Sequence, residues 1–252
     1  MTQGQSPITP EKEKAFLGIF EMNLVVHKKS RFSYRYHHFD LNAGCGYNHE
    51  AGCNGSPLMF LEAAANQGVA QYYAHFVDHK KKAIEELLTR IDDQRCTIYQ
   101  GDNREFVKAI PGLIRLAREN PDMALGSVLC DPNGTNLPLD ELIELSGLCP
   151  RLDLILNYSA RAWKRVRGWK RACGTDYASP ELYLAETLVL LRKKQWLIQD
   201  PLNDNHEWMI VVGRNYPMAG WSKMRFYDMD SPKGKEILRR SLSRRESTIS
   251  LF

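Results

Sequence analysis

Five apolar runs alternate with amphipathic stretches from residue 34 to residue 159, and this alternation limits the possible folds more than any other feature. The runs span residues 34–41, 71–78, 95–102, 124–132 and 152–159. Helical spacing of apolar residues marks the stretches between them, at 55–68, 79–91, 103–120 and 139–147. Strands joined through helices form parallel βαβ units, so the alternation predicts an α/β fold with a mostly parallel sheet.

The two ends of the chain depart from this alternation. Residues 11–29 have apolar residues at helical spacing, and we expect a helix there, ahead of the first strand. After a further predicted helix at 179–194, apolar runs at 195–201 and 207–215 flank the polar turn "LNDNH". Two strands joined by a short polar turn form a hairpin, so this part of the sheet is predicted to be antiparallel.

Length and composition allow one large domain with short additions at both ends. The 252 residues can bury a sizeable core, and we expect a lead-in and helix over 1–33, a main domain over 34–228 and a basic, solvated tail over 229–252. The net charge of +4 permits a polyanionic partner without requiring one. Six scattered cysteines, no secretory leader and no long apolar run predict a reduced, soluble, cytoplasmic protein without a membrane span.

Polar residues follow four of the predicted strands. The first strand ends in "DLNAGCG" (40–46), the second in Asp78, the third in Asp102 and Asn103, and the fourth in "CDPN" (130–133). Ligands of an open α/β sheet bind at the carboxyl ends of its strands, where glycines let the backbone approach the ligand. Each aspartate alone is equally well explained as a helix cap or an Asx turn. Their succession along the chain favours one shared ligand site.

The order of elements from residue 34 to residue 215 resembles that of the class I S-adenosylmethionine-dependent methyltransferases. The resemblance implies a Rossmann-like α/β fold with a mostly parallel, seven-stranded sheet, helices on both faces and a C-terminal antiparallel hairpin. It also implies S-adenosylmethionine as the cofactor, with glycine backbone against its methionine part and carboxylates accepting from its amino, ribose and adenine groups. The implied cofactor-binding residues are Asp40, Asn42, Ala43, Gly44, Gly46, Asp78, Asp102 and Asn103.

Four motifs narrow the resemblance to one family. "HHFDLNAGCG", the helix start "GSPLMFLEAA", "DPNG" and the later "MRFYDMDSPKGKEIL" look like segments of the three-Cys-motif partner proteins. That family consists of methyltransferase-like proteins of bacterial mobile elements. The chain departs from the family's "DLFAGPG" and "DPFG" patterns at Asn42, Cys45 and Asn133.

The motif "DPNG" also resembles the "[DN]PP[YFW]" motif of methyltransferases that modify the exocyclic amino groups of adenine or cytosine. The resemblance implies that Asp131, Pro132 and Asn133 are the catalytic residues. In that arrangement the carboxylate and the next carbonyl accept hydrogen bonds from the target amine, and an aromatic ring stacks on the extruded base. The aromatic position of the motif is not aromatic here, so the ring is expected from Tyr47 or Tyr158.

The stretch "SARAWKRVRGWKRACG" follows the fifth predicted strand and combines basic side chains with tryptophans. Such a mixture pairs with phosphates and stacks on bases, and loops after parallel strands lie on the ligand side of a sheet. The other interpretation is a solvated helix whose tryptophans pack on the sheet. With the two tyrosines, the predicted substrate-binding residues are Tyr47, Tyr158, Arg161, Trp163, Lys164, Arg165 and Arg167.

Cys45, His49 and Cys53 are spaced four residues apart and are candidate ligands of a metal ion. Structural zinc sites usually have paired ligands in two separate knuckles, with two to four residues between the members of a pair. The chain has only one irregular cluster of this kind, so the sequence predicts no metal and treats the cysteines as small loop residues.

Two functions of different classes follow from these patterns. The first is an S-adenosylmethionine-dependent methyltransferase that acts on nucleic acid, DNA or RNA, with an exocyclic amino group of a base as the target. The second is a catalytically inactive, cofactor-binding partner subunit that docks onto another protein of a mobile-element or defence system. Methylation of a small molecule or peptide is a third possible function, and the basic block supports it less than it supports a nucleic-acid substrate. The sequence does not decide the oligomeric state.

Overall fold

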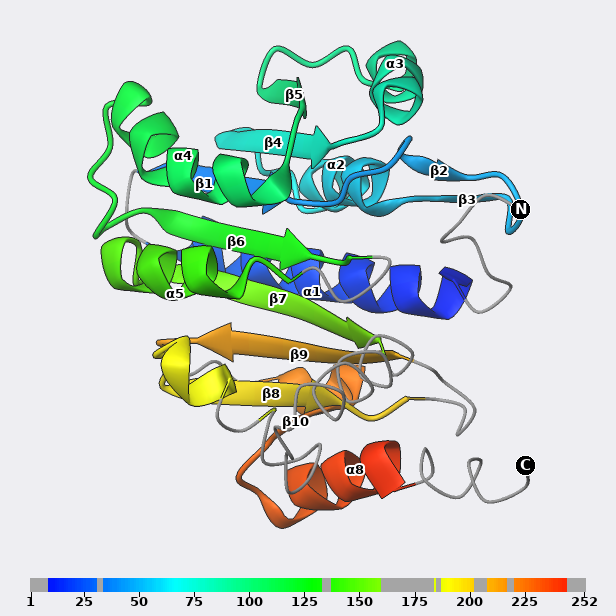
Figure 1. The fold of residues 1–252 in the computed structure, drawn as a ribbon, viewed down its shortest axis with the longest axis vertical. Helices are drawn as coiled ribbons and strands as arrows, with labels where there is room; N and C mark the ends of the chain where they lie inside the picture. The colour runs from blue at the N-terminus through cyan, green and yellow to red at the C-terminus, as the bar shows by residue number, and fades with distance from the viewer. Residues whose placement is uncertain are drawn as a thin grey trace, which may run out of the picture.

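Eight strands form one continuous sheet at the centre of the molecule (Figure 1). The computed structural model describes residues 9–30, 34–132, 137–159, 184, 187–201, 208–216 and 220–243. In chain order the strands of the sheet are β1 (Tyr36–Asp40), β4 (Tyr72–Asp78), β5 (Cys96–Gln100), β6 (Leu125–Cys130), β7 (Leu152–Ser159), β8 (Gln195–Gln199), β9 (Trp208–Arg214) and β10 (Phe226–Asp228). Across the sheet their order is β10-β8-β9-β7-β6-β1-β4-β5.

The strand order reverses beside β1. From β1 the chain builds outward through β4 to β5, and it then returns to place β6 on the other side of β1. All of these strands pair in parallel, and Asp40 at the end of β1 lies opposite Phe76 of β4 and Leu129 of β6. In open α/β sheets such a reversal opens a crevice at the carboxyl ends of the two diverging strands. We call the edge at which β1, β4, β5, β6 and β7 end the C-terminal edge.

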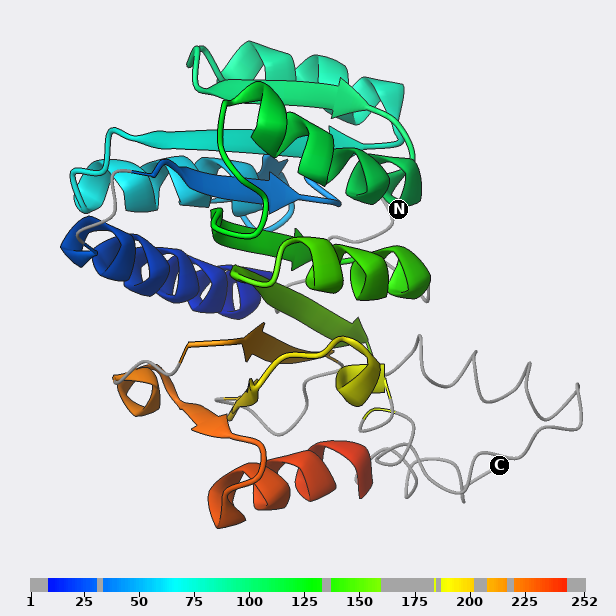
Figure 2. The ribbon, with the colours of Figure 1, turned by 90° about the vertical axis from the view of Figure 1, so that its left-hand side faces the viewer.

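Helices cover both faces of the sheet (Figure 2). One core cluster joins the sheet to α1 (Thr9–Lys29), α2 (Ser56–Asn66) and α3 (Lys81–Arg90). The other core cluster joins it to α4 (Asn103–Leu116), α5 (Leu139–Leu148) and α8 (Pro232–Ser243). Among the described residues, no helix combines the length and the apolar character that crossing a membrane requires.

Aromatic packing explains how β1 is buried on both faces despite its two histidines. The His38 ring stacks on Phe60 of α2 at 4.1 Å between centroids and meets the edge of Phe20 of α1 at 4.9 Å. Its Nδ1 lies 3.0 Å from the Ser127 hydroxyl of β6. Burial lowers the pKa of His38 to about 3, so the ring is neutral and packs as an aromatic core residue.

The described elements confirm the predicted fold class. All five predicted βα strands are present, the sheet is mostly parallel, and β8 and β9 form the predicted antiparallel hairpin. The sheet has one strand more than the seven expected, because β10 adds to its edge beside β8. A separate two-stranded hairpin of β2 (Tyr47–Asn48) and β3 (Cys53–Asn54) was also not predicted.

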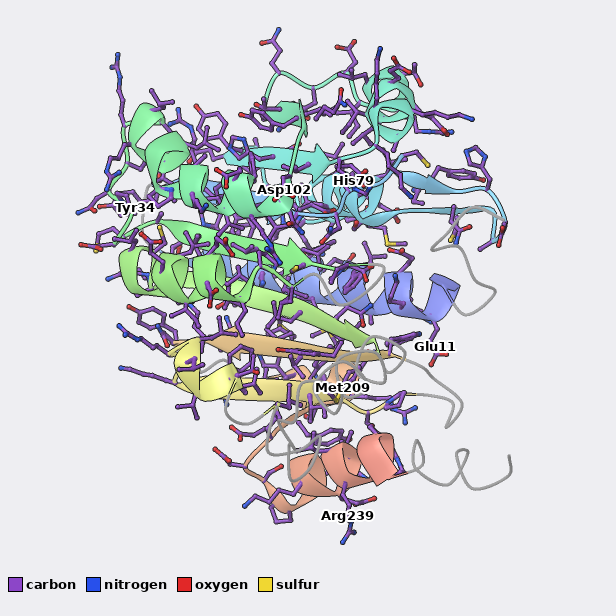
Figure 3. The ribbon with its side chains drawn as sticks, viewed as in Figure 1. Glu11, Tyr34, His79, Asp102, Met209 and Arg239 are labelled. Carbon is purple, nitrogen blue, oxygen red and sulfur yellow. The ribbon has the colours of Figure 1, made fainter. Side chains whose placement is uncertain are left out.

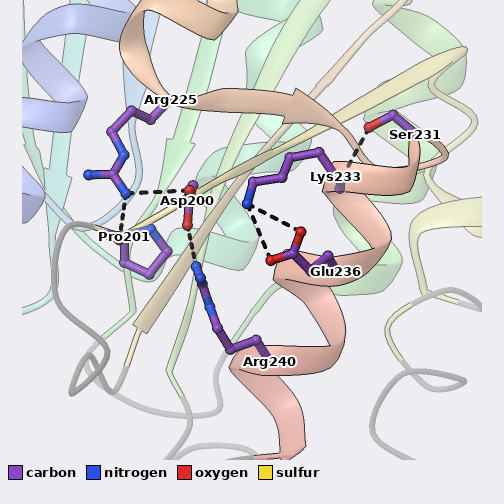
Figure 4. Close-up of polar contacts among 8 residues, drawn as sticks. Asp200, Pro201, Arg225, Ser231, Lys233, Glu236 and Arg240 are labelled. Atoms are coloured by element: carbon purple, nitrogen blue, oxygen red, sulfur yellow. Dashed lines mark hydrogen bonds and ion pairs between the residues drawn. The ribbon is translucent and has the colours of Figure 1, made fainter.

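Ion pairs on Asp200 hold the last elements against the sheet, where a solvated tail was expected (Figure 4). Asp200 follows β8 and is buried, and it pairs with Arg225 just before β10 and with Arg240 of α8. Arg225 also donates to the Pro201 carbonyl at 3.1 Å. Ile237 of α8 is fully buried in the core, so the basic sequence of this helix conceals an apolar face.

Candidate functional site

The glycine loop after β1 is fixed by close packing. Gly44 and Gly46 adopt positive φ angles of +61° and +73°, a conformation that costs glycine little. A Cβ on Gly46 would lie 2.6 Å from the Leu87 side chain of α3, so the loop sits tightly against that helix. A Cβ on Gly44 would meet no atom within 4 Å. The Gly44 backbone therefore faces open space, where a ligand can approach it closely.

Hydrogen bonds join this loop to the end of the next strand. Asp78 ends β4, and its Oδ2 accepts from the Gly44 amide at 3.0 Å while its Oδ1 accepts from the Lys80 amide at 2.8 Å. The Ala43 amide donates to the Val77 carbonyl at 2.9 Å. A carboxylate has about four acceptor positions, so Asp78 keeps capacity for further donors such as hydroxyl groups.

Asp40 lies beneath the loop and has no exposed surface. Its Oδ2 accepts from the Ser56 hydroxyl at 2.6 Å, and its Oδ1 accepts from the Asn42 amide at 3.1 Å. Asn42 in turn lies with its Oδ1 3.7 Å from the Cys130 sulfur of β6. Burial raises the pKa of Asp40 to about 7, against the hydrogen bonds from Ser56 and Asn42, which lower it. The contacts make Asp40 a support that connects the loop to the start of α2.

The third strand ends in residues that begin a helix. Asp102 is exposed, and its Oδ1 accepts from the Arg104 amide at 2.7 Å, which makes it the N-cap of α4. Asn103 is the first residue of that helix and is half-buried. The structure therefore gives Asp102 the capping role that was the alternative to ligand binding. An exposed cap leaves its second oxygen toward solvent at the C-terminal edge.

Asp131 follows β6 and is held by two donors from distant parts of the chain. Lys12 of α1 donates from Nζ to Oδ2 at 2.6 Å, and Asn157 of β7 donates from Nδ2 to Oδ1 at 2.6 Å. The Asp131 and Lys12 side chains are only 15% and 12% exposed. Burial lowers the pKa of Lys12, but the negative charges of Asp131 and Glu13 outweigh burial and raise it above its usual value. The carboxylate of Asp131 is therefore oriented and paired with a charged ammonium.

Glu13, the neighbour of Lys12 in the sequence, adds a second carboxyl group near Lys12 and Asp131. It is 6% exposed, and its Oε2 is buried without a hydrogen-bond partner among the described residues. Burial raises the pKa of Glu13 to about 8, and the negative charges of Asp131 and Asp40 act in the same direction. A carboxyl group with such a pKa holds its proton near neutral pH and exchanges it readily.

Sequence reasoning did not identify Lys12 or Glu13 as site residues. The ion pair between Lys12 and Asp131 joins positions 119 residues apart, and "EKEK" reads as the solvated end of a helix. The one local signal is that these residues lie in the first turn of α1. This helix packs along the sheet, and its first turn therefore reaches the C-terminal edge. Figure 3 shows this direction, with Glu11 of α1 and His79 toward that edge and Tyr34 at the opposite edge.

The predicted tyrosines do not meet at Asp131. Tyr47 of β2 lies beneath the Arg90 guanidinium of α3 at 4.9 Å and packs edge-on against the His49 ring. Tyr158 packs with the core on the face of α4 and α5, because alternation along β7 directs it away from the face of its neighbour Asn157. Pro132 is buried. The predicted residues that lie outside the described part of the chain are Asn133, Arg161, Trp163, Lys164, Arg165 and Arg167.

Comparison with known proteins agrees with the architecture. No family model matches the chain, and no curated protein matches it in sequence. The solved structure of protein LPL1258 from Legionella pneumophila, described under the family model DUF519, is similar with a TM-score of 0.55 and 11% identity over 85% of this chain and 88% of that one. A provisionally assigned methyltransferase from Thermobifida fusca YX is similar with a TM-score of 0.53 and 12% identity over 82% and 81% of the two chains. At these identities the similarity shows the fold, which is the Rossmann-like fold of class I methyltransferases.

Proposed function

We propose that the chain is an S-adenosylmethionine-dependent methyltransferase that modifies an amino group of a nucleic-acid base. One observation carries the proposal. At the reversal of strand order, the Gly44 backbone is tied to the Asp78 carboxylate on one side of β1, and Asp131 is held in a fixed orientation on the other side. A cofactor cradle and a polar acceptor site thus lie on the two sides of the reversal, where open α/β sheets bind their ligands.

The residues at the C-terminal edge fit S-adenosylmethionine in shape and in charge. The open space over Gly44 admits a ligand close to the backbone, and Asp78 has acceptor capacity for ribose hydroxyls. Asp102 and Asn103 stand at the end of the next strand, where they would hold the adenine. Glu13 and Asp40 have raised pKa values, and both groups would ionise more readily beside a cofactor that carries a sulfonium and an ammonium. When bound, the cofactor supplies an electrophilic methyl group.

The role of Asp131 is to position the nucleophile. Its carboxylate and the Pro132 carbonyl accept hydrogen bonds from the target amine and thereby direct the nitrogen lone pair at the methyl group. Lys12 and Asn157 keep the carboxylate in one orientation, which makes them positioning residues. Methyl transfer is an in-line displacement that needs orientation more than a strong base. Gly134 stands where the "[DN]PP[YFW]" motif has its aromatic ring, so base stacking falls to another residue.

A polymeric substrate is supported by the basic block at residues 161–171. Its Arg and Lys side chains pair with phosphates and its two tryptophans offer stacking surfaces, in a chain with a net charge of +4. The block follows β7 directly, and the end of β7 lies at the C-terminal edge. A basic, tryptophan-containing segment directly after β7 in the sequence supports nucleic acid over a small-molecule substrate.

The second candidate function is a cofactor-binding subunit without transferase activity, which docks onto another protein of a mobile-element or defence system. The contacts of Asp131 favour it, because each of its oxygens already accepts a hydrogen bond from the chain itself. A target amine then has to share Oδ2 with Lys12 or displace it. The departure of "DPNG" from the "[DN]PP[YFW]" motif at Asn133 and Gly134 favours the same function.

Transfer of radiolabel distinguishes the two functions. The purified chain is incubated with methyl-tritiated S-adenosylmethionine and, separately, DNA, RNA or nucleic acid-depleted cell extract. We expect label on DNA or RNA. Label in the protein fraction alone would contradict a nucleic-acid substrate. Cofactor binding without label on any fraction would favour the docking subunit.

A further inference from the structure

A second cluster of side chains lies beside the glycine loop, and its residues are of the types that bind metal ions. The Cys45 sulfur, a ring nitrogen of His49 and a carboxylate oxygen of Glu86 all lie within 4.8 Å of one another. Nε2 of His49 is 2.6 Å from Oε1 of Glu86. The three residues come from the loop after β1, the turn after β2 and helix α3, so folding alone brings them together. We propose that Cys45, His49 and Glu86 form a binding site for Zn²⁺.

The backbone around Cys45 is built to hold its sulfur in place. Cys45 lies between the two glycines of positive φ, and its thiol donates to the Tyr47 carbonyl at 3.0 Å. The Gly46 carbonyl accepts from the Gly55 amide at 2.8 Å. Because Gly46 packs against Leu87, the residue after Glu86, the loop and helix α3 have a fixed separation. The sulfur and the Glu86 carboxylate are therefore positioned together before any ion binds.

The Glu86 carboxylate is oriented by a neighbour on its own helix. Arg90 donates from Nη2 to Oε1 at 2.7 Å, and its guanidinium lies over the Tyr47 ring at 4.9 Å. The same oxygen takes the contact from His49. Arg90 is also the nearby positive charge that opposes a cation. A thiolate and a carboxylate together neutralise a divalent ion, so Arg90 faces a neutral site once the ion is bound.

The donor set selects the type of metal. Thiolate sulfur and imidazole nitrogen suit Zn²⁺ and exclude Mg²⁺ and Ca²⁺, which prefer oxygen ligands. Binding replaces the thiol proton of Cys45, which leaves to solvent, and it requires the neutral His49 ring with its proton on Nδ1, so that Nε2 can bind the ion. Three protein ligands leave one tetrahedral position open, and the His49 side chain is 55% exposed. The site therefore fits an exchangeable ion better than a sealed structural zinc.

The structure groups a different set of side chains from the set that the sequence spacing suggests. Spacing alone grouped Cys45 and His49 with Cys53, but Cys53 pairs opposite Asn48 in the β2–β3 hairpin and does not belong to the cluster. Glu86 takes the third position from an element 37 residues away from His49. The site does not depend on the proposed function, although it lies on the loop that would hold the cofactor.

Calorimetric titration of the full chain with ZnCl₂ tests the proposal, together with the absorption spectrum of the Co²⁺-loaded protein. We expect one Zn²⁺ per chain bound at this site and a thiolate-to-cobalt charge-transfer band. Cys45→Ser removes the band, and Cys45→Ser and Glu86→Gln each weaken Zn²⁺ binding, on the order of 100-fold for the thiol.

Matched controls come from the same elements. Cys53→Ser changes a thiol of the adjacent hairpin, and Glu85→Gln changes an exposed carboxylate of the same helix, so both variants should bind Zn²⁺ like the unaltered chain. Unchanged thermal unfolding without metal shows that each variant is folded. Equal Zn²⁺ affinity of Cys45→Ser and the unaltered chain would overturn the proposal, and so would the absence of Zn²⁺ binding to the unaltered chain.

Discussion

The two edges of the sheet both bury charged groups, but they pair them differently. At the edge opposite the C-terminal edge, Arg214 donates to Asp153 at 2.8 Å. Lys193 donates to the Pro150 and Leu152 carbonyls at 3.2 and 2.8 Å. At the C-terminal edge, the carboxyl groups of Glu13, Asp40 and Asp131 gather around the single ammonium of Lys12. At the opposite edge, the burial of paired charges stabilises the strands. At the C-terminal edge, three carboxyl groups share the ammonium group of Lys12.

The difference assigns separate roles to the two edges. The buried pair of Asp153 with Arg214 leaves Nε and Nη1 of Arg214 without partners among the described residues, but these groups are donors and do not suit a cationic ligand. Glu13 has a buried oxygen without a partner among the described residues, and Asp78 has spare acceptor positions. A buried carboxyl oxygen without a partner at one edge, and a buried ion pair at the other, are expected where the first edge binds a cationic ligand.

The largest effect is expected from Asp153→Ala, which leaves Arg214 buried without its counter-charge. We expect a loss of about 3–5 kcal/mol in the free energy of unfolding, measured by urea denaturation at pH 8. Asp153→Asn keeps a hydrogen-bond acceptor and should lose less. Cofactor affinity of the folded fraction should not change in either variant. A loss below about 1 kcal/mol would mean that the pair does not hold this edge together.

Asp131→Ala should affect chemistry and leave binding almost unchanged. Without the carboxylate the target amine is no longer aligned, so we expect methyl transfer to fall on the order of 100-fold or more. Calorimetric affinity for the cofactor should stay within a few-fold. Asp131→Asn retains an acceptor oxygen and the shape of the side chain, and it should keep more activity than alanine. Full transfer activity in Asp131→Ala would remove this residue from the catalytic assignment.

Glu13→Gln should change how stability depends on pH. Burial raises the pKa of Glu13 to about 8 from an ordinary 4.5, so the folded state binds this proton more tightly than the unfolded state. The resulting stability is present below pH 4.5 and is lost as pH rises through 8. Relative to the unaltered chain, Glu13→Gln should therefore gain on the order of 2 kcal/mol between pH 5 and pH 8.

Asp40 provides a second variant for the same pH series. Burial raises its pKa to about 7, so Asp40→Asn should flatten the curve between about pH 4 and pH 7. Urea denaturation at unit pH intervals measures both effects. Identical pH dependence in the unaltered chain and both variants would contradict the raised pKa values of these two carboxyl groups.

Asp78→Asn should produce the smallest effect, confined to the cofactor. Loss of the charge weakens the bonds to the ribose hydroxyls, and we expect the dissociation constant to rise about tenfold, or about 1.4 kcal/mol. Asp92→Asn is the matched control, because Asp92 is exposed and follows α3 at the opposite edge. Equal affinities in the two variants would remove Asp78 from the cofactor site.

The main strands could be predicted because each is a continuous apolar run between helical segments. The structure places β1, β4, β5, β6 and β7 within two residues of the predicted bounds. Elements of two or three residues, such as β2 and β10, have no periodicity to detect. Helix α8 was missed because its charges dominate the pattern, and what holds it is the pairing of Arg240 with Asp200, 40 residues away.

Candidate site residues divide in the same way. Gly44 and Asp78 could be placed at one edge because both follow parallel strands, and the structure joins them by a hydrogen bond. Lys12 and Glu86 could not, because each lies on a helix that reads as a solvated surface and reaches its site only through tertiary packing. The sequence therefore predicts site residues that lie in loops directly after parallel strands, and it does not predict those that lie on helices.

Hydrogen exchange with and without S-adenosylhomocysteine, the demethylated product, tests the central claim most directly. Binding at the C-terminal edge should slow amide exchange in residues 42–46, 78–80 and 101–104, where the Gly44 and Lys80 amides already bond to Asp78. Residues 149–153 and 192–194, at the opposite edge, should exchange at unchanged rates. Protection of the opposite edge, or no protection at millimolar product, would contradict the assignment of the acid-rich edge as the ligand site.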